Sequence, residues 1–408
     1  MKYGLIGEKL GHSFSKPIHE SIADYTYEIK EIPRDGLDLF MRERAFSGIN
    51  VTIPYKQSVM PYLDFIDEAA QKIGAVNTVV NRDGKLYGYN TDFGGMKMLI
   101  EKQGFCYEGK KIAVLGSGGT AKTARAVAEA LGAAEIVTVS RKGKVNYENL
   151  LSIHGDCDYI INTTPCGMYP DTDGSAVDVS LFGALSGVTD VVYNPLRTKL
   201  CLDCERQGIR CECGLYMLVA QAVLASQIFS GESFDVKKTA DEIYLRILNE
   251  KRNIVLIGMP GSGKTTVGKA LAERLGKTFT DTDDLITQEY GPISNIFEEK
   301  GEAFFRDIES VAVKNVALRN GLVIATGGGA VLRKENVEYL KHNGVLFFLD
   351  RPLKDIIPTE DRPLSRDLDA LKKRYEERYR IYLSSCDEKT EIDGKIENAV
   401  SRITEKLK

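Results

Sequence analysis

The sequence predicts an α/β protein built of three successive units. Glycine-rich turns at residues 116–119 and 258–263 each follow a short apolar run and precede a helical pattern, an order typical of parallel α/β sheets. The chain also has 408 residues with 43% apolar content, more than the roughly 250–300 residues that one hydrophobic core holds. We therefore expect units at about residues 1–100, 101–213 and 252–408.

The first unit, residues 1–100, has the pattern of an open α/β domain. Short apolar runs at Tyr3–Ile6, Gly48–Ile53 and Ala75–Val80 alternate with helical patterns, as expected when strands pack against helices. Later helical patterns at Tyr216–Phe229 and Lys237–Asn249 are expected to complete this domain, from about residue 214 to residue 249.

The second unit, residues 101–213, predicts a Rossmann domain. Ile112–Leu115 reads as a strand, Thr120–Leu131 as a helix and Glu135–Ser140 as the next strand. Apolar segments at Tyr159–Asn162 and Thr189–Tyr193 extend the same parallel sheet. The turn is a shortened relative of G-x-G-x-x-G/A, which binds a dinucleotide pyrophosphate; its residues are Gly116, Ser117, Gly118, Gly119 and Thr120.

The residues after the second Rossmann strand indicate which dinucleotide is bound. Enzymes that use NAD place Asp or Glu there to bind the ribose 2′-hydroxyl, whereas this chain has Ser140, Arg141 and Lys142. Basic side chains suit a 2′-phosphate, so NADP is predicted over NAD. The alternative is a plain Rossmann scaffold on which Arg141 and Lys142 are exposed surface charges.

The third unit, residues 252–408, contains a full P-loop motif. Residues 258–265 read G-M-P-G-S-G-K-T, directly after the apolar strand Asn253–Ile257 and before the helical pattern Val267–Leu275. The motif predicts that backbone N–H groups and Lys264 bind ATP phosphates and that the Thr265 hydroxyl binds Mg²⁺. The predicted ATP-binding residues are Gly261, Ser262, Gly263, Lys264, Thr265 and Thr266.

Two carboxylates downstream of the P-loop are candidates for phosphoryl-transfer chemistry. Asp281 and Asp283 follow a predicted strand, and strand alternation places both on one face. Asp281 is expected to act through the Mg²⁺ and Asp283 to accept the proton of a substrate hydroxyl. The alternative is a pair of solvated loop acids.

Further motifs make residues 252–408 resemble shikimate kinase, which has a P-loop fold of the nucleoside-monophosphate-kinase kind. They are Phe305-Arg306, the triplet at residues 327–329, Arg362-Pro363 and an arginine near the C-terminus. The resemblance implies that a lid arginine, Arg362, covers ATP and that shikimate is held by Asp283, Arg306, Gly328 and Arg378. Arg378 and Arg380 both fit the carboxylate-binding arginine, while Arg374 and Arg380 can also be solvated helix charges.

Residues Met1–Asn249 resemble shikimate dehydrogenase. The motifs are Ser13 and Ser15, N-V-T-I-P-Y-K at 50–56, G-A-V-N-T at 74–78, N-T-D at 90–92 and G-L-Y-M-L-V-A-Q at 214–221. The resemblance implies a catalytic pair, Lys56 and Asp92, of which Asp92 also binds the substrate. It implies a carboxylate site at Ser13 and Ser15, further substrate contacts at Thr52, Asn77, Tyr193 and Gln221, and nicotinamide contacts at Gly214 and Met217.

Together these resemblances imply a bifunctional enzyme. It reduces 3-dehydroshikimate with NADPH and then phosphorylates the resulting shikimate with Mg²⁺-ATP to shikimate 3-phosphate. One alternative is a quinate/shikimate dehydrogenase using NAD, fused to a kinase of another small polyol. A second is that one half is a degenerate nucleotide-sensing module, against which the presence of Lys56, Asp92, Lys264 and Asp283 argues.

Composition excludes other classes of partner. The formal net charge is −4, and the chain lacks a basic block with interleaved aromatic residues, so nucleic acid is not an expected partner. The first residues reach Gly4 and Gly7 too soon for a signal-peptide apolar region, and apolar runs stay shorter than a membrane span. A cytoplasmic protein is expected, and the sequence leaves its oligomeric state open.

Cysteines and histidines outside the motifs are expected to be structural. The cysteine group at residues 201, 204, 211 and 213 spans a predicted helix end, a cap at Gly208 and a strand. Its last pair is C-x-C, not the C-x2-C of zinc ribbons, which favours packed thiols over a metal site. His12 and His19 lie close to the first predicted site, where capping or turn roles are favoured over catalysis.

Overall fold

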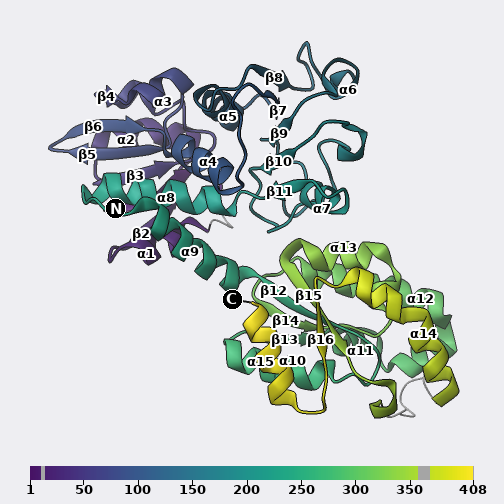
Figure 1. The fold of residues 1–408 in the computed structure, drawn as a ribbon. Coiled ribbons are helices and arrows are strands. Elements are labelled where there is room, and N and C mark those ends of the chain that lie inside the picture. Colours follow the sequence, from purple (N-terminus) through teal and green to yellow (C-terminus); the bar gives the residue numbers. More distant parts are fainter. Residues whose placement is uncertain (11–13, 357–367, 408) are drawn as a thin grey trace. The chain divides into compact units, whose positions relative to one another are not determined.

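The computed structural model describes residues 1–10, 14–356 and 368–407. The chain divides into two compact units, Met1–Ile247 and Leu248–Lys408, which are coloured purple to teal and green to yellow in Figure 1. Two predicted site residues, Ser13 and Arg362, lie outside the described residues, as does His12. Within the described part of the chain, the helices all lack the combination of length and apolar character needed to cross a bilayer.

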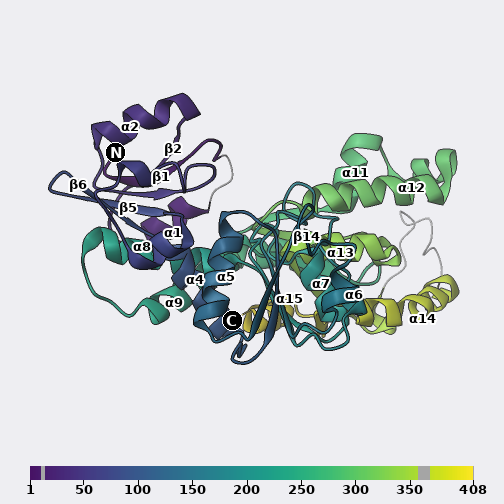
Figure 2. The same ribbon diagram turned by 90° about the horizontal axis from the view of Figure 1, so that it is seen from above.

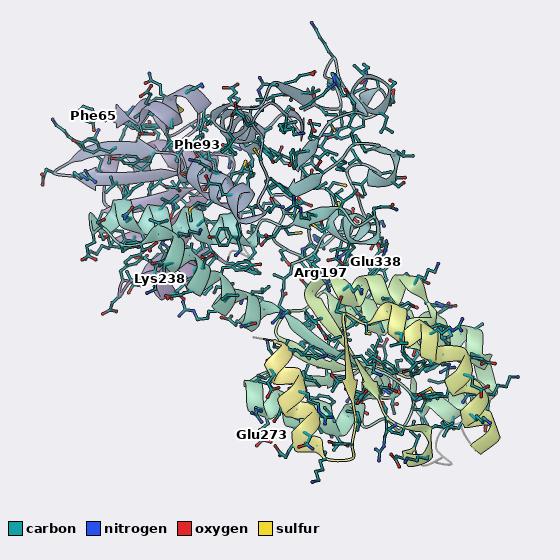
Figure 3. All side chains as sticks on the ribbon, in the orientation of Figure 1. Phe65, Phe93, Arg197, Lys238, Glu273 and Glu338 are labelled. Atoms are coloured by element: carbon teal, nitrogen blue, oxygen red, sulfur yellow. The ribbon has the colours of Figure 1, made fainter. Side chains whose placement is uncertain are left out.

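The first sheet of unit Met1–Ile247 is mixed. Its strand order is β2-β1-β3-β5-β6-β4; β1 pairs parallel with β2 and β3, whereas β5 pairs antiparallel with both β3 and β6. The strands are β1 (Tyr3–Gly7), β2 (Tyr27–Glu31), β3 (Gly48–Val51), β4 (Phe65–Ile66), β5 (Thr78–Arg82) and β6 (Lys85–Tyr89). At the β4 edge, the half-exposed Phe65, labelled in Figure 3, stacks on Tyr87 with ring centroids 4.8 Å apart.

Helices from both ends of this unit cover the sheet. They are α1 (Ser15–Ile22), α2 (Leu37–Glu43), α3 (Glu68–Ile73), α4 (Thr91–Lys102), α8 (Leu215–Ser230) and α9 (Val236–Lys251). Helices α4 and α8, far apart in sequence, lie side by side in Figures 1 and 2. They approach closely at Gly95, where an added Cβ would meet the Met217 carbonyl at 2.8 Å and Gln221 Cβ at 3.0 Å. This packing brings residues from the C-terminal part of the unit to the first sheet.

The second sheet of this unit is entirely parallel, with strand order β11-β10-β9-β7-β8. Its strands are β7 (Lys111–Leu115), β8 (Glu135–Val139), β9 (Tyr159–Asn162), β10 (Gly187–Asp190) and β11 (Arg210–Glu212), and its helices are α5 (Gly119–Ala130), α6 (Leu150–His154) and α7 (Lys199–Arg206). Buried aliphatic side chains of β7 and β9 fill the core beneath these helices, as expected for a sheet covered on both faces.

Unit Leu248–Lys408 contains one sheet, in which all the strands are parallel and the strand order is β13-β14-β12-β15-β16. The strands are β12 (Asn253–Ile257), β13 (Thr278–Asp281), β14 (Leu322–Ala325), β15 (Gly344–Asp350) and β16 (Glu388–Glu391). The helices are α10 (Lys264–Leu275), α11 (Thr282–Tyr290), α12 (Ile293–Ala317), α13 (Lys334–Asn343), α14 (Leu368–Ser385) and α15 (Ile396–Lys406). Two separate apolar clusters, one on each face of β12, form its core.

The α/β class predicted from the sequence is confirmed, and the differences are at element ends. The strand predicted over Thr189–Tyr193 is β10, which ends at Asp190 because the chain then turns and the Val192 carbonyl accepts from Gly214 N–H at 2.8 Å. The helix predicted to begin at Val267 begins at Lys264, directly after the left-handed Gly263. Local apolar patterns locate a strand better than they locate its last residue.

Candidate active sites

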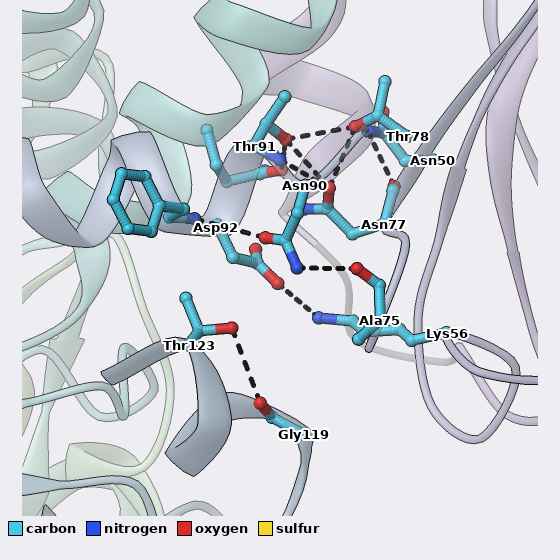
Figure 4. A network of polar contacts seen from close by, with 12 residues as sticks. Asn50, Lys56, Ala75, Asn77, Thr78, Asn90, Thr91, Asp92, Gly119 and Thr123 are labelled. Carbon is cyan, nitrogen blue, oxygen red and sulfur yellow. Dashed lines mark hydrogen bonds and ion pairs between the residues drawn. The ribbon is translucent and has the colours of Figure 1, made fainter. Parts of the chain in front are cut away.

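Lys56 and Asp92 form an ion pair in the first unit (Figure 4). Lys56 lies in the turn after β3, Asp92 lies in the first turn of α4, and Lys56 Nζ donates to Asp92 Oδ2 at 2.5 Å. The two side chains are 20% and 12% exposed, so they are shielded from bulk water but still open to a ligand. The Lys56 carbonyl accepts from Val76 N–H at 2.8 Å, and a helix N-terminus favours the Asp92 charge. Both groups are therefore held in place.

A buried network supports this pair from the sheet and from α8. Asn77 Oδ1 accepts from Thr91 N–H at 2.7 Å, and Thr91 Oγ1 lies 3.2 Å from Asn77 Oδ1 and 3.4 Å from Gln221 Oε1. Thr78 Oγ1 lies 3.0 Å from Thr91 Oγ1 on the other side. Because Thr91 directly precedes Asp92, the network orients the start of α4. Thr91 was not among the predicted site residues, since its partner Gln221 lies 130 positions away.

The remaining predicted substrate contacts lie at element ends of the same unit. Ser15 is buried at the start of α1, and Thr52 is half-buried directly after β3. The Tyr193 ring lies 5.5 Å from the Phe14 ring, and burial raises the pKa of its hydroxyl. Of the predicted residues, the structure thus gathers four around the start of α4, namely Lys56, Asp92, Asn77 and Gln221. It places the other three at the ends of surrounding elements.

His19 belongs to the core instead of a site or a turn. It is fully buried, its ring stacks on Tyr27 with centroids 4.0 Å apart, and Nδ1 lies 2.7 Å from the Tyr25 hydroxyl. Burial lowers the pKa of His19 to about 3, against a weaker opposing hydrogen bond from Asn50. It is therefore neutral at physiological pH, and the predicted capping or turn role is replaced by packing.

The glycine-rich turn between β7 and α5 faces open space. Gly116 has a φ of 114°, and an added Cβ would meet a threonine hydroxyl at 2.6 Å, so a side chain is excluded. At Gly118 and Gly119 an added Cβ would meet nothing within 4 Å, and Ser117 is exposed. Helix α5 begins at Gly119 and continues through Thr120. Its first N–H groups lack helical acceptors, which is the basis of phosphate binding at helix N-termini.

The predicted residues around this turn come from three other segments. After β8, Ser140 is half-buried while Arg141 and Lys142 are exposed. Gly214 precedes the first residue of α8, and Met217 is buried in the first turn of that helix. An added Cβ at Gly214 would overlap a neighbouring backbone carbonyl, so only glycine fits there. In Figure 4, Gly119 and Thr123 of α5 lie on the Asp92 side of the network, and α4 packs against α5.

The P-loop of unit Leu248–Lys408 surrounds its own lysine. The loop glycines have left-handed or extended positive φ angles that favour glycine: 146° at Gly258, 81° at Gly261 and 95° at Gly263. Lys264 is 8% exposed, and its Nζ donates to the carbonyls of Gly258 and Met259, each at 2.9 Å. Ser262 is fully buried and Thr266 is exposed on α10. The ammonium group is thus held directly beneath the loop.

Thr265 and Asp281 place two hard oxygen donors beside the loop, and Asp283 follows them. Thr265 Oγ1 donates to Asp281 Oδ2 at 2.8 Å, a donor set that fits Mg²⁺. The prediction that Asp281 and Asp283 share a strand face is wrong, because β13 ends at Asp281 and α11 begins at Thr282. Asp281 instead caps α11 by accepting from Asp283 N–H at 3.0 Å. Both carboxylates nevertheless line one cavity.

That cavity, of about 450 Å³, joins the P-loop to the other predicted kinase residues. Its lining includes residues from the P-loop, α10, β13, α11, α12, the loop after β14 and α14. The charged and polar lining residues that carry the site are Lys264, Thr265, Asp281, Asp283, Arg306, Glu309, Thr326, Arg374 and Arg378. A phosphate-binding loop, three carboxylates and three arginines therefore face one space.

The glycine triplet is explained by three close approaches. An added Cβ at Gly327 would meet Asp283 Oδ1 at 2.6 Å and Glu309 Oε1 at 2.7 Å. At Gly328 it would meet the Pro260 ring at 2.6 Å, and at Gly329 it would overlap the Arg306 guanidinium. Each glycine thus lets the backbone come within contact of a different wall of the cavity.

Arg306 is held by two carboxylates, neither of which the sequence analysis identified. Its guanidinium donates to Glu309 Oε2 at 2.7 Å and to Glu302 Oε1 at 2.9 Å. Glu309 is 1% exposed, and burial raises its pKa although the Arg306 charge opposes the shift. The i, i+3 spacing of Arg306 and Glu309 on α12 is the sequence signal that could have identified it.

Helix α14 places the candidate arginines in different surroundings. Arg378 is 7% exposed and donates to the Gly328 carbonyl at 3.2 Å, whereas Arg380 is exposed. Arg374, one turn earlier, is half-buried and lines the cavity. Burial, and secondly the Arg378 charge, lower the pKa of Arg374. The solvated-charge interpretation therefore holds for Arg380 and is wrong for Arg374.

Comparisons with known proteins follow the same division of the chain. The family model for the shikimate dehydrogenase substrate binding domain matches residues 5–79. Shikimate dehydrogenase (NADP(+)) of Clostridium perfringens (strain 13 / Type A) is 40% identical over 263 residues, covering 59% of this chain and 96% of that protein. The chain belongs to the shikimate dehydrogenase family. The shikimate kinase family model matches residues 260–408, so a shikimate kinase domain follows the dehydrogenase part.

Solved structures agree with this assignment for the dehydrogenase part. A chorismate mutase/shikimate 5-dehydrogenase fusion protein from Clostridium acetobutylicum has a TM-score of 0.57 and 36% identity, covering 60% of this chain and 96% of that one. Shikimate 5-dehydrogenase from Thermus thermophilus, in complex with NADP(H) and shikimate, has a TM-score of 0.54 and 26% identity, covering 60% and 99%. Both resemblances inferred from the motifs are confirmed. We refer to Met1–Ile247 as the dehydrogenase unit and to Leu248–Lys408 as the kinase unit.

Proposed function

We propose that this chain reduces 3-dehydroshikimate to shikimate with NADPH and phosphorylates shikimate to shikimate 3-phosphate with Mg²⁺-ATP. The observation that carries the first activity is the Lys56–Asp92 pair at 2.5 Å on the Asn77 and Gln221 network. The second activity is carried by the single cavity that contains the P-loop, Asp283 and three arginines.

In the dehydrogenase unit, Lys56 is the proton donor. When bound, NADPH would supply the hydride to the ring ketone, and negative charge would then develop on the ketone oxygen. Lys56 Nζ stabilises this charge and transfers a proton to it. Asp92 orients the lysine through their ion pair, and it also accepts a hydrogen bond from a ring hydroxyl. Ser13 and Ser15 bind the substrate carboxylate, and Thr52, Asn77, Tyr193 and Gln221 orient the ring.

The dehydrogenase unit has features that fit NADP. The open turn of residues 116–120 leaves backbone N–H groups for the pyrophosphate. The exposed Arg141 and Lys142 follow β8 where the 2′-phosphate of the adenine ribose binds in a Rossmann domain. Gly214 and Met217 at the start of α8 are assigned to the nicotinamide end. The positive charges of Arg141 and Lys142 favour the 2′-phosphate of NADP over the 2′-hydroxyl of NAD.

In the kinase unit, the chain positions phosphates and an acceptor hydroxyl. The P-loop N–H groups and Lys264 bind the β- and γ-phosphates of ATP, and Thr265 and Asp281 are the residues that hold Mg²⁺, which offsets phosphate charge. Arg362 is assigned to the lid over ATP. The residues thus align the γ-phosphate toward the cavity, where catalysis depends chiefly on position and electrostatics.

The acceptor end of the cavity fits a small carboxylated ring alcohol. Arg306 and Arg378 pair with the carboxylate, and the backbone at Gly328 lies against the ring. Asp283 accepts the proton of the reacting hydroxyl. Glu309 acts as a positioning residue because it fixes the Arg306 guanidinium through the 2.7 Å contact. Arg374 adds a third positive charge to the lining of the cavity.

Separate loss of the two activities tests the proposal. Lys56→Ala should abolish NADPH oxidation with 3-dehydroshikimate and leave phosphorylation of added shikimate intact, and Lys264→Ala should do the reverse. The exposed lysines Lys72 and Lys269 provide matched controls, whose alanine variants should keep both activities. Loss of both activities in either active-site variant would count against independent sites.

A comparison of substrates tests the finer assignment. Steady-state rates with shikimate and quinate, each with NADP and NAD, should favour shikimate with NADP. Faster oxidation of quinate with NAD would overturn the substrate assignment while leaving the Lys56 mechanism in place. For the kinase unit, phosphorylation of another polyol in preference to shikimate would overturn its assigned acceptor.

A further inference from the structure

Four cysteines of the dehydrogenase unit converge between a helix and a strand. Cys201 and Cys204 are spaced i, i+3 on α7, which places them on one helix face. Cys211 and Cys213 are spaced i, i+2 along β11 and its end, which places them on one strand face. Because α7 packs on β11, the two pairs face each other, and the Cys201 thiol is in hydrogen-bonding contact with Cys213.

The innermost part of this cluster includes a carboxyl group. Cys201 Sγ lies 2.9 Å from Cys213 Sγ. One carboxyl oxygen of Asp190, at the end of β10, and the two sulfurs all lie within 4.8 Å of one another. All three residues are buried: Asp190 is 0%, Cys201 2% and Cys213 5% exposed. Three donor atoms within this separation can share one metal ion, because metal–sulfur and metal–oxygen bonds are about 2.0–2.3 Å long.

The groups around the three donors are neutral hydrogen-bond donors. Asp190 accepts from the Asn162 amide at 2.9 Å, from Val192 N–H at 3.0 Å and from the Thr198 hydroxyl at 2.7 Å. Thr198 N–H also donates to Cys213 Sγ at 3.3 Å. These donors orient the ligand atoms as outer-shell partners do around metal ions. These hydrogen-bond donors carry no positive charge. The negative charge of ionised thiols and an ionised carboxyl would therefore be balanced by a bound cation.

We propose that Asp190, Cys201 and Cys213 form a binding site for a thiophilic divalent cation of the Zn²⁺ type. Ligand sets that are rich in sulfur and include one oxygen donor suit tetrahedral Zn²⁺. Binding forms three coordination bonds to the chain and releases the protons of the thiols, and of the carboxyl where it is protonated, to solvent without oxidation or reduction. Because binding releases protons, occupancy should increase with pH.

Packing alone explains a thiol such as Cys157, but it does not explain this cluster. Cys157 is fully buried in the apolar core of the same sheet, as expected of a small hydrophobe. Cys201 and Cys213 are instead gathered around a buried carboxyl and its polar donors. The prediction of packed thiols from the sequence agrees with the burial of these two cysteines. The proposed site adds a ligand role to that packing, and Cys157 serves as the matched control.

The site joins three elements at one edge of the Rossmann sheet. Its donors come from the end of β10, the first turn of α7 and the end of β11. Cys213 directly precedes Gly214 and the start of α8. A bound cation would crosslink these elements, and we therefore expect a stabilising role that is separate from hydride transfer and from the Mg²⁺ site of the kinase unit.

A metal titration of the full chain tests the site. Protein purified with a thiol-free reductant and stripped with a chelator is titrated with Co²⁺ and then with Cd²⁺. Wild type should bind about one thiolate-coordinated ion per chain, seen as sulfur-to-metal charge-transfer absorption and intense tetrahedral Co²⁺ bands. The oxygen donors of the kinase unit give neither signal, so the two sites are distinguishable.

Variants assign the signal to the cluster. Cys213→Ser and Asp190→Asn should each weaken Cd²⁺ binding at least about tenfold, while Cys157→Ser should bind as wild type does. Zn²⁺ should raise the Tm of the wild type and not that of Cys213→Ser, and NADPH oxidation by each metal-free variant reports that it is folded. Absence of thiolate bands in wild type, unchanged bands in Cys213→Ser, or a Cys201–Cys213 disulfide in protein isolated under reducing conditions would overturn the proposal.

Discussion

A single methyl group at Gly327 should impair the kinase and spare the dehydrogenase. In Gly327→Ala the new Cβ would lie 2.6 Å from Asp283 Oδ1 and 2.7 Å from Glu309 Oε1, whereas ordinary contacts begin at 3.4 Å. The two carboxylates must therefore retreat by about 0.8 Å and about 0.7 Å, or the backbone must shift by a similar amount. Asp283 is the proposed proton acceptor and Glu309 orients Arg306, so one substitution displaces both.

The expected loss follows from the size of this displacement. Misplacing a catalytic group by about 1 Å costs on the order of 100-fold in rate, which corresponds to about 3 kcal/mol in activation free energy. The coupled assay of ADP formation from shikimate and ATP should show this loss in kcat/KM. NADPH oxidation by the same protein provides an internal control, and it should match that of the wild type.

Two further measurements separate displacement from unfolding. Gly183→Ala is the matched control, because an added Cβ there would meet nothing within 4 Å, and it should keep both activities. Overpacking at Gly327 should also lower stability by about 1–3 kcal/mol, which a thermal melt detects while the protein remains folded at room temperature. A folded Gly327→Ala protein with wild-type kinase kcat/KM would refute the reasoning.

Three other predictions address single side chains. Arg378→Lys should raise the kinase KM for shikimate about tenfold, because a charge-assisted hydrogen bond contributes about 1.5–3 kcal/mol, whereas Arg380→Lys should leave it unchanged in the same steady-state assay. Arg141→Ala should raise the KM for NADPH about tenfold without changing the KM for NADH; an equal rise for both cofactors would exclude a 2′-phosphate contact. His19 has its pKa lowered from 6.5 to about 3, so the folded state binds fewer protons than the unfolded state between these values. Its contribution to stability is complete above pH 6.5 and decreases as pH falls, by about 2 kcal/mol at about pH 5. His19→Phe, which keeps the stack on Tyr27, should remove that decrease when urea unfolding is compared at about pH 5 and about pH 7, and an unchanged decrease would contradict the assignment.

Contiguous motifs account for what could be predicted. The P-loop and the Rossmann turn are each a short segment between a strand and a helix, and both were located correctly in the structure. Their geometry is set by neighbouring residues, since positive φ at Gly261 and Gly263 and the start of α10 are local properties. Local patterns also identified the helix and strand that carry the cysteine pairs.

Local reasoning failed where a chain reversal or a distant partner decided the result. Asp283 was assigned to a strand face because alternation was continued too far, past the point where Asp281 caps α11. Arg374 was treated as a solvated charge because nothing near it in sequence shows that α14 packs along the cavity. Glu309 was missed for the same reason, although its spacing from Arg306 was visible.

The sequence by itself determined the two nucleotide-binding loops, the α/β class and the families to which the two parts are similar. Only the tertiary structure decided which polar and charged side chains face each other: Thr91 with Gln221 across 130 positions, Arg378 in place of Arg380 beside Gly328, and Asp190 with Cys201 and Cys213. Loops of this kind depend on backbone torsions and neighbouring N–H groups, which are encoded locally. A buried charge depends on what packs against it, and that is settled only when distant segments meet.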